Sequence, residues 1–200
     1  MLAAFPHITK LIGIITVSML MTHGVSDPER RTKVRVAGDS EVVISGTTNV
    51  NQFTCRYNLE EMELPIRLVY DDKKEHILFN NASLQLANDC FDCGGRAINK
   101  DFKELLQTES HPQVEMKLLY VDPPQKENSK VGVGMEIIIA GVSRRYNAVL
   151  DCNVDNKISV NGVLELKLSD FNLQPPKKMM GMIKVDDEIM VRLAIKMSEV

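Results

Sequence analysis

The chain has 200 residues, of which 44% are hydrophobic and 26% are charged. This balance is typical of a globular protein and excludes intrinsic disorder and fibrous repeats. The 24 basic residues are outnumbered by 27 acidic ones, and no long run has a single sign, so we expect no nucleic-acid partner. There is no Trp, and there are only 6 Phe and 4 Tyr, which predicts an aliphatic interior.

The amino terminus differs in composition from the rest of the chain, because Lys10 is followed by an uninterrupted apolar run from Leu11 to Met21. As a helix this run spans about 16 Å, roughly half the hydrocarbon core of a bilayer, which is short for a permanent anchor. We predict a cleaved signal peptide over residues 1–24, a polar lead-in over 25–40 and one domain over 41–200. The mature protein is expected in the periplasm or outside the cell, without a stable membrane span, and its oligomeric state is not predicted.

Apolar residues then alternate with polar ones along most of the chain, which is the period of strands with one buried face. The strongest runs cover residues 64–70, 114–120, 131–139, 146–152, 158–168 and 189–197, and weaker ones cover 41–45, 49–57 and 77–86. Short polar turns such as residues 71–74 and 155–157 separate them. This pattern predicts an antiparallel meander.

One segment breaks the two-residue period. Asn99 can cap a short helix in which Phe102, Leu105 and Leu106 share a face, and Pro112 closes the region. About eight long strands either stack as a sandwich or close as a barrel, and closure removes the exposed edges. We therefore predict an all-β, up-and-down antiparallel barrel with one short helix. An outer-membrane barrel would need aromatic girdles, whereas the aromatics here are scattered, so a soluble barrel is expected.

The parity of the longest runs predicts which side chains face the interior. The opposite face carries charged residues such as Lys117, Glu136 and Arg192, so the apolar face must look inward. At about eight strands, an interior is either just filled by side chains or holds one small ligand. The candidate lining residues are Met116, Leu118, Met135, Ile137, Leu164, Leu166, Val191 and Leu193.

The four cysteines, Cys55, Cys90, Cys93 and Cys152, all lie in the exported part, where oxidation is expected. Their even number predicts disulfides, with three possible pairings. Cys90 and Cys93 could instead form a redox-active pair, although such pairs usually open a helix in a βαβ unit. The histidines form no pair with metal-ligand spacing, so we expect no metal, no cofactor and no catalytic residue.

The sequence resembles the YceI-like family of exported, lipocalin-like barrels associated with polyisoprenoid lipids. The resemblance covers about residues 41–197 and rests on four segments in the family's order. These are residues 43–53 (VISGTTNVNQF), residues 99–102 (NKDF) with 110–114 (SHPQV), residues 134–146 (GMEIIIAGVSRRY), and residues 168–171 (LSDF) with 185–191 (VDDEIMV).

This resemblance implies a disulfide between Cys55 and Cys93, since relatives have Cys at both positions, and leaves Cys90 to pair with Cys152. It also implies a non-enzymatic barrel that binds a long apolar ligand, a polyisoprenoid or similar lipid, in its lumen for carriage or storage in the cell envelope. Three alternatives remain: a structural envelope barrel without a ligand, a thiol oxidoreductase that uses Cys90 and Cys93, and a carrier of another lipid.

Overall fold

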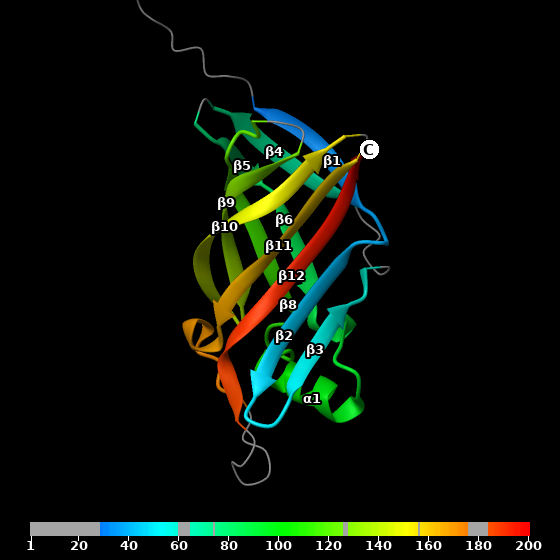
Figure 1. Cartoon of the computed structure of the whole chain (residues 1–200), viewed down its shortest axis with the longest axis vertical. Helices are drawn as coiled ribbons and strands as arrows, with labels where there is room; N and C mark the ends of the chain where they lie inside the picture. Colours follow the sequence, from blue (N-terminus) through cyan, green and yellow to red (C-terminus); the bar gives the residue numbers. More distant parts are fainter. Residues whose placement is uncertain (1–28, 60–64, 74, 126–127, 156, 176–183) are drawn as a thin grey trace, which may run out of the picture.

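The computed structural model describes residues 29–59, 65–73, 75–125, 128–155, 157–175 and 184–200, so the predicted signal peptide lies outside the described residues. Most of the described chain is extended (Figure 1). The elements are β1 Arg30–Val36, β2 Glu41–Thr48, β3 Gln52–Tyr57, β4 Ile66–Asp72, β5 Ile77–Asn81, β6 Ser83–Ala87, the 3₁₀ turn η2 Asn88–Cys90, β7 Phe91–Asp92, α1 Arg96–Leu105, β8 Gln113–Val121, β9 Asn128–Ile139, β10 Val142–Val154, β11 Ile158–Lys167, the 3₁₀ turn η3 Leu168–Phe171 and β12 Val185–Glu199.

Eight strands form a closed antiparallel ring in the order β1-β4-β5-β8-β9-β10-β11-β12. The ring closes because β12 also pairs with β1, from Val34 opposite Glu199 to Val36 opposite Met197. From β8 to β12 each strand neighbours the next one in the chain, as in a meander. The predicted all-β antiparallel barrel with a short helix is therefore confirmed.

Two predicted boundaries are wrong. The polar lead-in contains β1, whose pattern RRTKVRV shows only Val34 and Val36 as apolar residues because the strand lies at one end of the barrel with an exposed outer face. The run over residues 77–86 is two strands, because β8 pairs with β5 through Tyr120 and with β6 from Gln113 to Lys117. Pairing with distant strands, not local pattern, decides both cases.

The helix starts earlier than its predicted cap. α1 begins after Gly95, and Asn99 lies inside the first turn rather than at the N-cap. The Asn99 side chain instead accepts a hydrogen bond from the backbone N–H of Cys93 and donates one to Asp92. Asn99 therefore fixes the segment that precedes the helix, and the helix itself has no side-chain cap.

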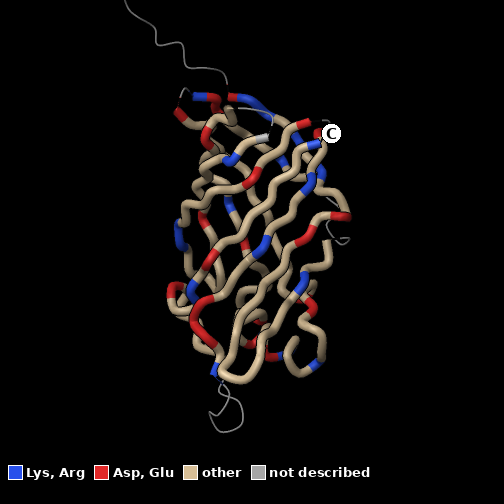
Figure 2. Tube along the Cα trace, viewed as in Figure 1, with Lys and Arg blue, Asp and Glu red and all other residues tan. Residues whose placement is uncertain are grey.

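The buried core of the barrel is mostly aliphatic. Charged residues are spread along the strands among uncharged ones (Figure 2). Met135, Ile137, Leu164, Leu166, Val191 and Leu193 are buried, and Met116 and Leu118 are half-buried. On the outer face Lys117 lies 3.5 Å from Glu115 and 3.7 Å from Glu136. The inward parity predicted for the long strands is thus present in the structure.

The two ends of the barrel are built differently, and we call them the head end and the foot end. The head end holds β1, β4 and β5, while the foot end holds β2, β3, β7, α1 and η3 (Figure 1). At the foot, β12 pairs with β2 instead of β1. In the described structure, β10 pairs with β11 only from Asp151 to Val154, and Phe171 of η3 is buried beside the unpaired part of β10.

Candidate functional site

The barrel contains a cavity of about 60 Å³ at its foot end, and every side chain that lines it is apolar. Five of the eight predicted lumen residues line it, namely Met116, Ile137, Leu164, Leu166 and Val191. The other three, Leu118, Met135 and Leu193, lie outside its lining. Towards the head end, Leu150 fills the space above Gly162, where an added Cβ would lie 2.2 Å from its Cδ2 atom.

Several lining residues were missed by the sequence analysis. Val114, Ile139 and Ile189 lie on strands of the ring. The others come from the elements outside the eight-stranded ring and from the 3₁₀ turns and their surroundings: Val42, Ile44, Phe53, Leu86, Phe91, Phe102, Leu105, Leu106, Leu168 and Leu173. The helical spacing of Phe102, Leu105 and Leu106 was the available signal that α1 has an apolar face. That this face closes the foot of the barrel depends on tertiary packing.

The cavity is small compared with a lipid chain. A dry apolar cavity of about 150 Å³ is known to accept benzene, so the 60 Å³ here would not take even that ring without movement of side chains. In this structure the lumen is mostly filled by its own Leu, Ile, Val and Phe side chains. Binding of a chain therefore requires that some of these side chains be displaced.

A larger hollow, an open groove of about 440 Å³, lies next to the cavity between β3 and α1. We call it the foot groove. Its apolar lining residues are Phe53, Ala97, Ile98, Phe102, Leu105, Pro175 and Val185, its polar lining residues are Thr48, Asn51, Gln52, Thr54 and Asp101, and Cys55 and Cys93 also line it. A hollow of this composition can accept a molecule with an apolar part and a polar part.

Three residues border both hollows: Phe53, Phe102 and Leu105. Phe102 is buried, whereas Phe53 and Leu105 are half-buried. The ring of Phe53 lies over Gly46, its partner on β2, where an added Cβ would be 2.5 Å from the ring Cζ. Glycine at position 46 is therefore what allows the ring to lie this close to the sheet.

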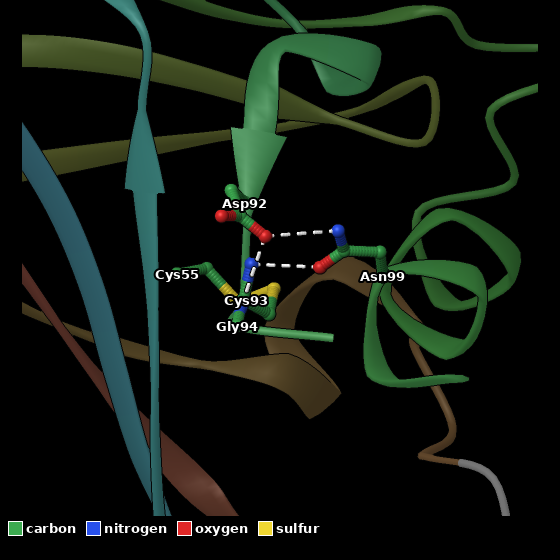
Figure 3. Close-up of a disulfide and its surroundings, with 5 residues drawn as sticks. All are labelled: Cys55, Asp92, Cys93, Gly94 and Asn99. Atoms are coloured by element: carbon green, nitrogen blue, oxygen red, sulfur yellow. Dashed lines mark hydrogen bonds between the residues drawn. A yellow bond between two sulfur atoms is a disulfide. The ribbon is translucent and has the colours of Figure 1, made fainter. Parts of the chain in front are cut away.

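A disulfide holds α1 against β3 (Figure 3). Cys55 of β3 is bonded to Cys93, which lies between β7 and α1. Asp92 accepts hydrogen bonds from Asn99 and from the N–H of Gly94, each 3.0 Å long, and these bonds lower the pKa of its carboxyl group, that from Asn99 most. Gly94 has φ 86°, a left-handed conformation that glycine adopts without strain.

The second expected disulfide is absent from the described structure, and that expectation is wrong. Cys90 belongs to η2 near α1, while Cys152 lies on β10 opposite Val160, in the part of β10 that is paired with β11. Burial raises the pKa of the Cys152 thiol. Because Cys93 is bonded to Cys55, the structure also holds no Cys90–Cys93 pair of the kind that a thiol oxidoreductase would use.

The polar groups around η3 hold the foot of the barrel together. Tyr146 of β10 donates a hydrogen bond to Asp170 at 3.1 Å and stacks on Phe171. Burial, together with this bond to Asp170, raises the pKa of Tyr146 to about 12, so the phenol is neutral over the physiological range. Asp187 accepts bonds from the N–H and the hydroxyl of Ser169, which lower the pKa of its carboxyl group.

Among the described residues, no helix has the length and apolar character needed to cross a bilayer. The sequence matches no family model and no curated protein.

Solved structures, in contrast, share the fold. A polyisoprenoid binding domain from Saccharophagus degradans superposes with a TM-score of 0.62 at 13% identity, covering 84% of this chain and 98% of that domain. BcnA of Burkholderia cenocepacia superposes with a TM-score of 0.52 at 15% identity, covering 81% of this chain and 99% of that chain. The YCEI protein of Campylobacter jejuni has a TM-score of 0.45 at 12% identity over 97% of this chain and 91% of that one. The chain thus has the fold of the polyisoprenoid binding domain and of BcnA, so the barrel fold that the sequence resemblance implied is confirmed.

Proposed function

We propose that this protein is an exported, non-enzymatic barrel that binds an apolar ligand, a polyisoprenoid or a similar lipid, at its foot end and carries or stores it in the cell envelope. The observation that carries the proposal is the wholly apolar cavity bordered by the open foot groove. A hydrocarbon chain needs only apolar lining, since each buried methylene contributes about 0.8 kcal/mol. The polyisoprenoid binding domain that shares the fold supports this class of ligand.

Export is supported by the apolar run from Leu11 to Met21 and by the Cys55–Cys93 disulfide, because disulfides persist in oxidising compartments. The absence of enzymatic activity is supported by the cavity, since none of its described lining residues carries a titratable side chain. General acid–base or nucleophilic catalysis inside the lumen would need such a group.

A structural barrel without a ligand is the second candidate function. The observation that favours it is the small size of the cavity, about 60 Å³, because small barrels can be packed solid. The two functions differ in what happens when bulk is added to the interior. In a ligand-binding lumen the added side chain occupies ligand space, whereas in a permanently filled core it overpacks the interior.

The test combines extraction of co-purified lipid from the native protein, followed by mass spectrometry, with two Trp substitutions on the same strand. Leu166→Trp points into the cavity, and Val163→Trp is the matched control because Val163 is 51% exposed on the outer face of β11. Ile137→Trp repeats the test from β9. We expect wild type and Val163→Trp to carry lipid and the two lumen variants to be folded but lipid-free.

A wild-type protein without lipid, together with a loss of about 1–3 kcal/mol of stability in Leu166→Trp, would support the structural barrel instead. A folded Leu166→Trp variant that carries as much lipid as wild type would show that the ligand does not occupy this part of the lumen.

A further inference from the structure

The foot groove and the lumen cavity are separated by a wall of three side chains, Phe53, Phe102 and Leu105. A ligand that lies partly in each hollow must pass this wall. The wall has one member on β3 and two on α1. Which of these side chains can move depends on how firmly β3 and α1 are held.

The helix is held at both of its ends. Before its first residue, the chain is fixed by the Cys55–Cys93 disulfide and by the hydrogen bonds of Asn99 (Figure 3). After its last turn, Thr108 donates to the carbonyl of Lys103, and the buried Asn88 donates to the Thr108 hydroxyl and to the carbonyl of His111. Phe102 and Leu105 are therefore carried by a fixed element.

The ring of Phe53 has more freedom. It is half-buried, and Gly46, on which the ring packs, has no side chain that would block its rotation. Rotation of an aromatic side chain about χ1 moves its ring by several ångströms without any change in the backbone. Since the foot groove is an open space of about 440 Å³ beside this ring, the ring of Phe53 has room to turn into it.

The groove also offers hydrogen bonds at the edge of β3. In the described structure β3 pairs with β7 only through Arg56 and Tyr57, so the segment Gln52–Cys55 has no strand partner on the side of α1. An unpaired strand edge presents both N–H donors and C=O acceptors. Asn51 and Thr54 belong to the same lining, whereas no Lys or Arg is among its described residues.

Building on the proposed function, we propose that the foot groove is the portal of the lumen and that Phe53 is its gate. The apolar chain of the ligand enters past Phe53, and its uncharged polar end, an alcohol or a carbonyl group, remains in the groove against the free edge of β3. An uncharged end fits this lining because its described residues offer neutral hydrogen-bonding groups and one carboxylate, that of Asp101, but no Lys or Arg that would pair with an anionic end.

The experiment follows the fluorescence of retinol, an isoprenoid with an uncharged alcohol end, on binding to the full mature protein in stopped flow. Phe53→Ala removes the gate and should raise both the association and the dissociation rate constants at least tenfold, while Kd changes less than threefold. Phe79→Ala is the matched control, because Phe79 on β5 packs on Tyr70 and borders neither hollow.

A second variant should act in the opposite direction. Ile98→Trp fills the groove without entering the lumen lining and should slow both rate constants at least tenfold. Glu104→Trp, on the exposed side of the same helix, should leave them unchanged. The polar end is tested by competition with retinoic acid, which has the same chain and an anionic end and should bind at least tenfold more weakly than retinol.

The outcomes separate the two proposals. If wild type binds retinol but the Phe53→Ala and Ile98→Trp rate constants equal those of wild type, the portal is overturned while lipid binding stands. Equal affinity for retinol and retinoic acid would overturn the position of the polar end. If wild type binds no retinol, lipid binding and the portal fall together.

Discussion

The two ends of the barrel are closed by different kinds of interaction. At the head end, β1 pairs with both β4 and β12, so backbone hydrogen bonds complete the ring. At the foot end, β10 and β11 separate, β12 pairs with β2, β2 pairs with β3 outside the ring, and side chains of α1 and η3 fill the openings. A ladder of backbone bonds fixes strand positions, whereas side chains change rotamer at small cost. Both hollows described above lie at the end closed by side chains.

The largest loss of unfolding free energy should follow removal of the Cys55–Cys93 disulfide, because this bond ties α1, which closes the foot end with its side chains, to the sheet. Its two cysteines are separated by 38 residues, and a loop of that length is worth about 4 kcal/mol in the chain-entropy model. Cys55→Ser and Cys93→Ser should each lower the free energy of urea-induced unfolding by about this amount, and the double variant should cost no more than either single one. Cys152→Ser, which removes an unbonded thiol, is the control.

If the losses of unfolding free energy in the two single variants simply add up in the double variant, the two cysteines are not bonded to each other. If the cysteine variants lose stability only at the foot end, the two ends of the barrel differ in how firmly they are held. In that case hydrogen exchange in α1 should increase while exchange in β9 stays slow.

Glycine substitutions compare the packed interior with the open foot directly. Gly162→Ala would place a methyl group against Leu150 in the filled part of the core, where overpacking costs about 1–3 kcal/mol. Gly46→Ala would push on the ring of Phe53, which can turn into the foot groove, so we expect a smaller loss of unfolding free energy. Equal losses in urea unfolding would mean that the foot is packed as rigidly as the rest of the interior.

The smallest change in stability is expected from ionisation of the Tyr146 phenol. This side chain holds η3 through its hydrogen bond to Asp170 and its stacking on Phe171. Its pKa of about 12 lies above the ordinary value of 10.0, so the fold favours the neutral form. The corresponding stability is fully present below about pH 10 and is lost as the pH rises from 10 to 12. Because the chain has no Trp, the difference in absorbance at about 295 nm between wild type and Tyr146→Phe isolates this titration.

That difference titration should be centred near pH 12, and Asp170→Asn should move it downward by removing the carboxylate that accepts the phenol proton in the hydrogen bond. A midpoint near pH 10 would show that Tyr146 is not held as the structure places it.

The sequence determined the elements whose signal is local. The two-residue period from β8 to β12 identified the long strands and their inward faces, because burial of one sheet face imposes alternation residue by residue. The spacing of Phe102, Leu105 and Leu106 likewise identified a helix with one apolar face. The even number of cysteines predicted disulfides. The pair Cys55 and Cys93 was indicated by the resemblance to relatives and not by the spacing of the cysteines.

Only the tertiary structure decided what depends on partners far apart in the chain. β1 has too few apolar residues to be recognised alone, and it is a strand because β4 and β12 supply its hydrogen bonds. The sequence alone allows a disulfide between Cys90 and Cys152. The fold, however, places them on different elements, η2 and β10, and no bond joins them. The foot groove and its wall exist because β3 and α1, which follow different local periods, meet there. Alternation specifies which side chains face inward, but the space left among them is set by how all the elements pack together.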